Sequence, residues 1–225
     1  MAHKILLTLL LQLTVAFSAF AQSDNIGEYL TQNSKRFLTV KGLELKPGLR
    51  MDDALKAFEA KGWERSEYFD TMKELRGTYV LNGTFYNRSN CNIMIMPTAN
   101  NKNIIGKIGI NLPNRDSFKE LKEEYDDLKS ALSDKYHMVS STESFDDKYL
   151  EESTSDILKL AALSRDEATF MTEFRLSENQ SDSLLGFIRL IINYVNSDNQ
   201  DVFYVSIVYF TYDFIIEQVN AVNDL

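Results

Sequence analysis

The sequence predicts an α+β domain in which an antiparallel sheet of about six strands, built from two β-β-β-α units, carries its helices on one face. Apolar and polar residues alternate through two separate stretches, residues 76–112 and 168–210. Each stretch is followed by apolar residues at spacings of three and four, as in an amphipathic helix. A shift of 97 residues superimposes the two stretches and places Ile93 on Leu190 and Ile110 on Ile207. We therefore expect an internal duplication.

A short helix is expected near the start of this domain, over residues 51–61. Ala54, Leu55 and Phe58 recur at helical spacing, and Gly62 is placed to end the helix in a left-handed conformation. This helix comes before the three strands of the first unit.

The first unit, within residues 37–137, contains three predicted strands and a long helix. Three sets of apolar residues share a strand face: Tyr79, Leu81 and Phe85; Cys91, Ile93 and Ile95; Ile108, Ile110 and Leu112. The helix is expected over residues 116–136, because Ser117 and Glu120 form a capping box ahead of a regular apolar stripe.

The second unit, residues 168–225, repeats this order. Its strands are indicated by Phe170, Phe174 and Leu176, by Ile188, Leu190 and Ile192, and by an apolar run over 202–210. A helix over 213–225 follows. The polar, acidic residues 138–167 between the units are interpreted as a connection with one helical turn around 157–163, and residues 37–225 as a single domain.

The first 21 residues have the pattern of a secretory signal peptide. Lys4 precedes an apolar run that is too short to span a membrane, and Ala19-Phe20-Ala21 forms an A-x-A cleavage site. We expect cleavage between Ala21 and Gln22, followed by a loose N-terminus over residues 22–36. Since Gln22 is not a cysteine, the mature chain is not expected to be a lipoprotein or to be inserted in a membrane. The predicted location is the periplasm or the extracellular space.

Charge and cysteine content narrow the class of protein further. The chain has 33 acidic and 24 basic residues, and the loss of Lys4 leaves a formal net charge of −10. Such a chain repels phosphate backbones, so nucleic acid is not an expected partner. Cys91 is the only cysteine, so no internal disulfide can form and the fold depends on packing.

No motif in the sequence indicates catalysis, a metal or a cofactor. The chain lacks a Gly-rich phosphate loop, G-x-S-x-G and H-E-x-x-H, and its mature part contains a single histidine, His137. The prediction therefore leans towards a protein that is not an enzyme and needs no cofactor. The oligomeric state is left open.

The favoured hypothesis is a binding module for a protein or glycan of the cell envelope or the extracellular space. Aromatic residues of the sheet, Tyr204 and Tyr209, and the only tryptophan, Trp63, are the candidate binding surface, with burial in the core as the alternative for each. Two other functions stay open. A glycan hydrolase requires a pocket with two carboxylates, at least one of raised pKa. A carrier of a small apolar ligand requires a cavity of about 300 Å³ or more, lined by Phe and Tyr.

Several segments resemble an uncharacterised family of small exported proteins from gut-dwelling Gram-negative bacteria. They are Asn90-Cys91-Asn92-Ile93, residues 107–118 with 128–129 and 135–136, and the final residues 221–225. The resemblance covers most of residues 37–225, implies an exported α+β fold and brings no active site. Residues 48–51, before a short helix and an antiparallel sheet, are also similar in architecture to β-lactamase-inhibitor-like domains.

Overall fold

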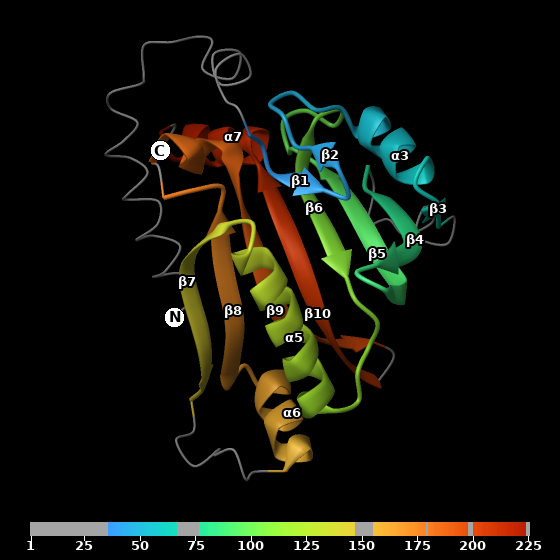
Figure 1. Cartoon of the computed structure of the whole chain (residues 1–225), viewed down its shortest axis with the longest axis vertical. Helices are drawn as coiled ribbons and strands as arrows, with labels where there is room; N and C mark the ends of the chain where they lie inside the picture. The colour runs from blue at the N-terminus through green and yellow to red at the C-terminus, as the bar shows by residue number, and fades with distance from the viewer. Residues whose placement is uncertain (1–35, 67–76, 147–154, 179, 198–199, 224–225) are drawn as a thin grey trace.

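An antiparallel sheet with helices against the face turned to the viewer forms the frame of the molecule (Figure 1). This computed structural model describes residues 36–66, 77–146, 155–178, 180–197 and 200–223. The predicted signal peptide, its cleavage site at Ala21 and Gln22, and nearly all of the segment 22–36 lie outside the described residues. No helix of the described ranges is long and apolar enough to cross a membrane.

The chain begins with a short hairpin and then forms long strands interspersed with helices. In chain order they are β1 (Thr39–Val40), β2 (Leu43–Glu44), α3 (Met51–Glu59), β3 (Glu64–Arg65), β4 (Tyr79–Phe85), β5 (Arg88–Pro97), β6 (Ile105–Asn111), α5 (Phe118–Ser133), β7 (His137–Phe145), α6 (Asp156–Ser164), β8 (Ala168–Arg175), the 3₁₀ helix η2 (Gln180–Leu185), β9 (Gly186–Ser197), β10 (Gln200–Thr211) and α7 (Tyr212–Asn223). β1 and β2 form a separate hairpin, and the large sheet has the order β3-β4-β5-β6-β10-β9-β8-β7.

The two halves of the large sheet meet at β6 and β10, where Ile110 pairs with Ile207. These two residues are 97 positions apart, which is the offset found in the sequence. The same offset carries the pair Ile93–Ile110 of the first half onto the pair Leu190–Ile207 of the second. The β4-β5-β6 and β8-β9-β10 hairpins therefore share a strand order and a pairing register across β5–β6 and β9–β10.

The sheet has eight strands, where about six were expected, because β3 and β7 were not anticipated. β3 is only two residues long, which is too short to show a period. β7 lies in the segment interpreted as an acidic connection, and nearly all of its residues are exposed. An edge strand with two solvated faces has no apolar alternation, so no pattern in the sequence indicates it. The helical turn expected near 157–163 is the nine-residue helix α6.

The helices do not all cover one face as expected. α5 packs across β8, β9 and β10, and α3, which starts only after the β1–β2 hairpin, packs on β5. α7 instead lies across one end of the sheet against β6 and β10, at the top of Figure 1. Its Phe214 ring lies 5.2 Å from that of Phe210, whose side chain points to the face opposite Tyr209. The chain turns directly from β10 into α7, and this leaves no length for a crossover onto the helical layer.

Trp63 closes the core between α3 and the sheet. It is 3% exposed, and its ring meets the Phe58 ring edge-on at a centroid distance of 6.4 Å. The indole lies directly over Gly83 of β4, where an added Cβ would be 2.5 Å from the Trp63 ring. Only a glycine at this position lets the indole approach the strand so closely.

We predict that Gly83→Ala lowers the free energy of unfolding by about 2 kcal/mol, because the indole must move out of a packed site. Gly109→Ala is the matched control, since its added Cβ meets the flexible end of Met96 at 3.5 Å and the Met94 Cβ at 4.0 Å, both ordinary contacts. The control should be neutral or slightly stabilising, because alanine leaves the unfolded chain with less conformational entropy than glycine does. Urea denaturation followed by Trp63 fluorescence measures both. Equal effects of the two variants would contradict this packing.

Glu143 ties the edge strand β7 to α5. Its carboxylate accepts hydrogen bonds from the Lys129 ammonium and lies 3.2 Å from the Lys122 ammonium. Partial burial alone would raise the pKa of Glu143, but the hydrogen bonds and charges of the two lysines outweigh burial and lower that pKa. An acid with a lowered pKa stabilises the fold above its unfolded-state pKa, and this contribution is lost as the pH falls through the folded-state pKa.

Glu143→Gln should therefore be less stable than the wild type at pH 7, and the two should converge on acidification below about pH 4, the range of an unperturbed glutamate. Glu123→Gln on the exposed side of α5 serves as the control and should change stability little at any pH. Thermal unfolding from pH 7 to pH 3 checks this. A difference between wild type and Glu143→Gln that does not depend on pH would show that the ion pairs do not stabilise the fold.

Candidate functional site

The three residues of the predicted binding surface do not lie together. Trp63 is buried beneath α3, and Tyr209 is 4% exposed on the helix-covered face of β10. Tyr204 is half-buried, and its odd spacing from Tyr209 places it on the opposite face. Only Tyr204 therefore faces the side of the sheet that the hypothesis of a sheet-borne binding surface requires. Tyr209 instead leads to a cavity on the helical side.

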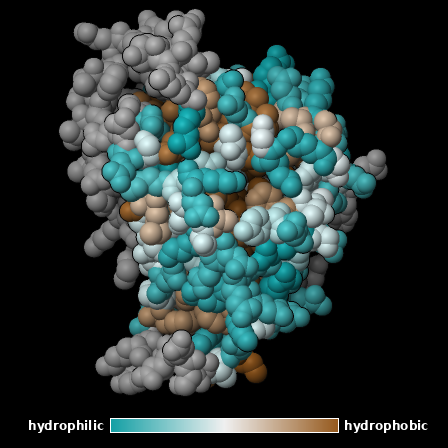
Figure 2. Space-filling model, in the orientation of Figure 1, coloured by the Kyte–Doolittle hydropathy of each residue, from teal (hydrophilic) through white to brown (hydrophobic). Residues whose placement is uncertain are grey.

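This cavity, the inner cavity, lies between the β1–β2 hairpin, α5 and β10, and its volume is about 290 Å³. Its floor consists of Ile207 and Tyr209, and the end of the β4–β5 hairpin supplies two aromatic walls, Phe85 and Tyr86. In the space-filling view, which has the orientation of Figure 1, apolar side chains are visible at the bottom of a hollow near the centre of this face (Figure 2).

The C-terminal half of α5 forms a second wall. Leu128, Ala131, Leu132, Lys135 and Tyr136 line the cavity, and their spacings of three and four put them on one side of the helix and of the residues that follow it. The same stripe packs α5 on the sheet, so the wall is part of the core.

The β1–β2 hairpin forms the third wall and is fixed in place by the core. Lys41 and Gly42 have φ angles of 50° and 78°, which matches a two-residue turn with both central residues in the left-handed region. On either side of the turn, Leu38, Val40 and Leu45 are fully buried. A hairpin anchored in this way holds the cavity open without a ligand.

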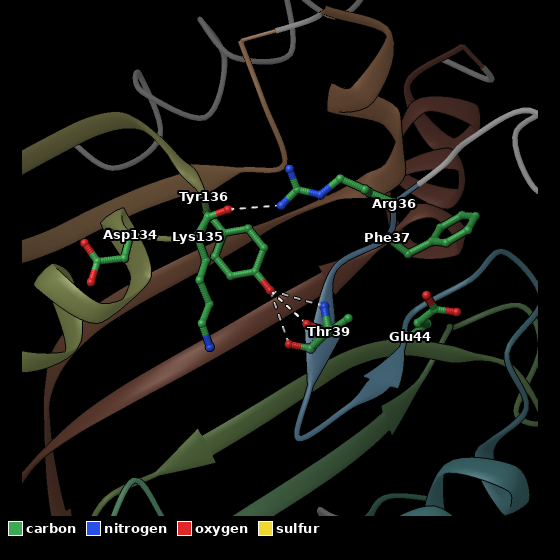
Figure 3. A pocket seen from close by; sticks show the side chains of 7 residues that line it. All are labelled: Arg36, Phe37, Thr39, Glu44, Asp134, Lys135 and Tyr136. Atoms are coloured by element: carbon green, nitrogen blue, oxygen red, sulfur yellow. Dashed lines mark hydrogen bonds between the residues drawn. The ribbon is translucent and has the colours of Figure 1, made fainter.

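A cluster of hydrogen bonds closes one end of the inner cavity. The Tyr136 hydroxyl lies 3.3 Å from the Thr39 amide, which donates to it, and 3.2 Å from the Thr39 hydroxyl. Beyond this contact lies a second, outer cavity of about 420 Å³ (Figure 3). Figure 3 shows Arg36 reaching over it to donate to the Lys135 carbonyl at 3.4 Å. The Tyr136–Thr39 contact thus separates an apolar cavity from a polar one.

The Tyr209 hydroxyl is a polar group of the inner cavity without a protein partner, since no described residue hydrogen-bonds to it. Burial, with a smaller effect of nearby Tyr136, raises the pKa of Tyr209 well above its ordinary value. The hydroxyl therefore keeps its proton at any physiological pH and is available as a donor. The hydroxyl opens on the cavity and is not among the fully buried unsatisfied atoms of the described residues, so a water or a ligand oxygen can accept from it.

The charges at the inner cavity are positive. Lys41 and Lys135 line it, and no carboxylate is among its lining residues. Lys61 adds a third positive charge nearby, because its ammonium donates to the Lys41 carbonyl. This local charge contrasts with the net charge of −9 of the whole chain.

No carboxylate lines the inner cavity, and two line the outer cavity. Glu44 and Asp134 line the outer cavity, but Glu44 lies 2.8 Å from the Lys46 ammonium. Asp213 has a pKa raised by burial, yet it accepts a hydrogen bond from the Gly48 amide and lines neither cavity. Within the described ranges, no group of three or more His, Cys, Asp or Glu residues could hold a metal ion.

Cys91 is buried near the charged side chains of Arg88 and Glu124, and it lines neither cavity. Its thiol donates to the Arg88 carbonyl at 3.2 Å. Burial raises the pKa of the Cys91 thiol, with Glu124 acting in the same direction, so the thiol stays protonated.

Sequence reasoning found Tyr209 but missed the rest of the site. Thr39 and Lys41 lie in a stretch of two-residue strands that has no readable period. Leu132 and Tyr136 were visible only as part of the apolar stripe of a helix. The sequence pattern of α5 does not show which parts of its apolar stripe are covered by other segments.

Comparisons of the chain with protein-family models, with curated proteins and with solved structures found no match. The resemblance to exported proteins of gut bacteria stays a prediction.

We predict opposite effects of removing the two tyrosine hydroxyls. Tyr136→Phe loses the hydrogen bonds to Thr39 and should lower the free energy of unfolding by about 1 kcal/mol. Tyr209→Phe is its matched control and should be neutral or stabilising, because it removes a donor that has no described partner. Urea denaturation without ligand measures both. A loss of stability in Tyr209→Phe as large as that in Tyr136→Phe would mean that the Tyr209 hydroxyl is already satisfied.

Proposed function

We propose that this chain is a non-catalytic binding protein that holds a small molecule with an apolar body in the inner cavity. The observation that carries the proposal is a cavity of about 290 Å³ with an apolar floor and four aromatic rings around it, those of Phe85, Tyr86, Tyr136 and Tyr209. Ligand sites are concave, mainly apolar and aromatic, and supplied with a few placed polar groups. The inner cavity has each of these properties.

The rigidity of the walls supports binding without a large rearrangement. The hairpin is held by buried Leu38, Val40 and Leu45, and the α5 wall belongs to the main core. A preformed site loses little conformational entropy when it is occupied. The volume, at the lower end of the range for small-molecule pockets, fits a compact molecule of up to about three rings or a short alkyl chain.

The predicted signal peptide would place this activity outside the cytoplasm, in the periplasm or beyond the cell. There a carrier of this kind would keep a poorly soluble molecule in solution between membranes or cells. A protein or glycan partner stays a second prediction. Of its three proposed residues, Tyr204 alone faces the open side of the sheet, so the inner cavity supports small-ligand binding better.

Binding of 1-N-phenylnaphthylamine, a neutral apolar dye whose fluorescence rises in apolar sites, tests this proposal. We expect one dye molecule bound per chain. Ala131→Phe places a ring inside the cavity and should abolish the signal, whereas Ser130→Phe on the neighbouring, solvent-facing position of α5 should retain it. Circular dichroism confirms that both variants are folded. No dye binding, or equal binding by the two variants, would refute the proposed site.

A further inference from the structure

The inner cavity changes in character along its length. Leu128 and Ile207 line it on the first part of the α5 wall and of the floor, and Lys135, Tyr136 and Tyr209 line it further along the same two elements. Both tyrosines, Tyr136 just after α5 and Tyr209 on β10, line this second part of the cavity. The cavity therefore has an apolar end and an end with hydroxyl groups and a cation.

Both lysines that line the cavity are free of carboxylate partners within the described ranges. Lys41 lies at the hairpin turn, with its ammonium 5.7 Å from the centre of the Phe85 ring, and Lys135 follows α5. Elsewhere on the same helix, Lys122 and Lys129 are paired with Glu143. In a chain with 33 acidic residues, two unpaired ammonium groups at one cavity are an arrangement that favours an anion.

We propose that the ligand of this cavity is a small amphipathic monoanion, an apolar body that ends in one carboxylate. The proposal rests on the proposed function and names the class of molecule that the site selects. The apolar body lies against Leu128 and Ile207. The carboxylate accepts a hydrogen bond from the Tyr209 hydroxyl and is neutralised by Lys135, with Lys41 adding attraction at the mouth. The Tyr209 hydroxyl and the two ammonium groups, which have no acceptor among the described residues, then have one in the ligand.

A neutral apolar cavity would select against such a ligand. A carboxylate is far better hydrated than an alcohol of the same length, so its transfer into an uncharged cavity is strongly unfavourable. A protein that binds the carboxylate more tightly than the alcohol must supply compensating charge and hydrogen bonds. A comparison of the two therefore reports directly on Lys41, Lys135 and Tyr209.

The test is calorimetric titration of the full mature chain at pH 7.5 with octanoate and with 1-octanol, and with the aromatic pair 4-phenylbutanoate and 4-phenyl-1-butanol. We expect each carboxylate to bind about tenfold more tightly than its alcohol at low salt, and added salt to reduce this preference. The pair with the larger preference shows whether the apolar body is an alkyl chain or a ring.

Two variants and a charge-matched control assign the preference to these residues. Lys41→Gln with Lys135→Gln should remove the preference, whereas Lys56→Gln with Lys119→Gln, which changes the net charge equally at exposed positions of α3 and α5, should keep it. Tyr209→Phe should weaken carboxylate binding about tenfold, the effect of losing a hydrogen bond to a charged acceptor.

The outcomes separate this proposal from the one it rests on. Dye binding that Ala131→Phe abolishes, together with alcohols that bind as tightly as carboxylates, would overturn the anionic ligand and leave the proposed function standing. A carboxylate preference that survives in the Lys41 and Lys135 double variant would also overturn it. Absence of binding by the dye, the alcohols and the carboxylates would overturn both.

Discussion

The pairing of β6 with β10 at the centre of the large sheet is the constraint on which the other contacts depend. It joins two groups of antiparallel strands that would otherwise be separate hairpins, and it does so through the direct pair Ile110–Ile207. The face of β10 that carries Ile207 is then continuous with that of β6, and both the helical layer and the floor of the inner cavity rest on it. A shift of this register by one residue would turn Ile207 and Tyr209 away from α5 and remove the floor.

The position of α5 on this sheet is set by a buried charge. Glu124 is 3% exposed and accepts hydrogen bonds from Arg88 at 2.7 Å and from Arg115 at 2.6 Å, both on the same carboxylate oxygen. These arginines come from β5 and from the loop after β6, so the contact fastens a helix that packs mainly on the second half of the sheet to the first half. Loss of one partner would leave a buried charge uncompensated, which is costly. The part of α5 that lines the inner cavity begins one to two helical turns after Glu124, so this cluster also fixes the position of that wall.

The sequence was informative wherever one face of an element is buried and the other is not. The alternation around Ile93 and Leu190 and the stripe through Leu128 identify the central strands and α5, because burial on one side imposes a period. The polar edge strand β7 and the two-residue strands of the β1–β2 hairpin have no such period, and they were missed. The cavity depends on how far the β1–β2 hairpin extends over α5, which is a relation between segments that are distant in the sequence. Of its lining residues, only Tyr209 was proposed as a binding residue, and it was expected on the opposite face of the sheet.

The exposed edge strand β7 also bears on how this molecule behaves at high concentration. An unpaired strand edge is a template onto which another chain can add, and long apolar edges lead to fibrous aggregates. β7 presents mostly Ser, Thr and Glu side chains to solvent, with an interruption of its pairing register between Met138 and Ser140. Apart from the exposed Met138 and Val139, the strand is polar on both faces up to Phe145, and such a strand with an irregular register is a poor template for cross-β growth. The polar residues that leave β7 without a recognisable period are therefore also those that disfavour the addition of another chain at this edge of the sheet.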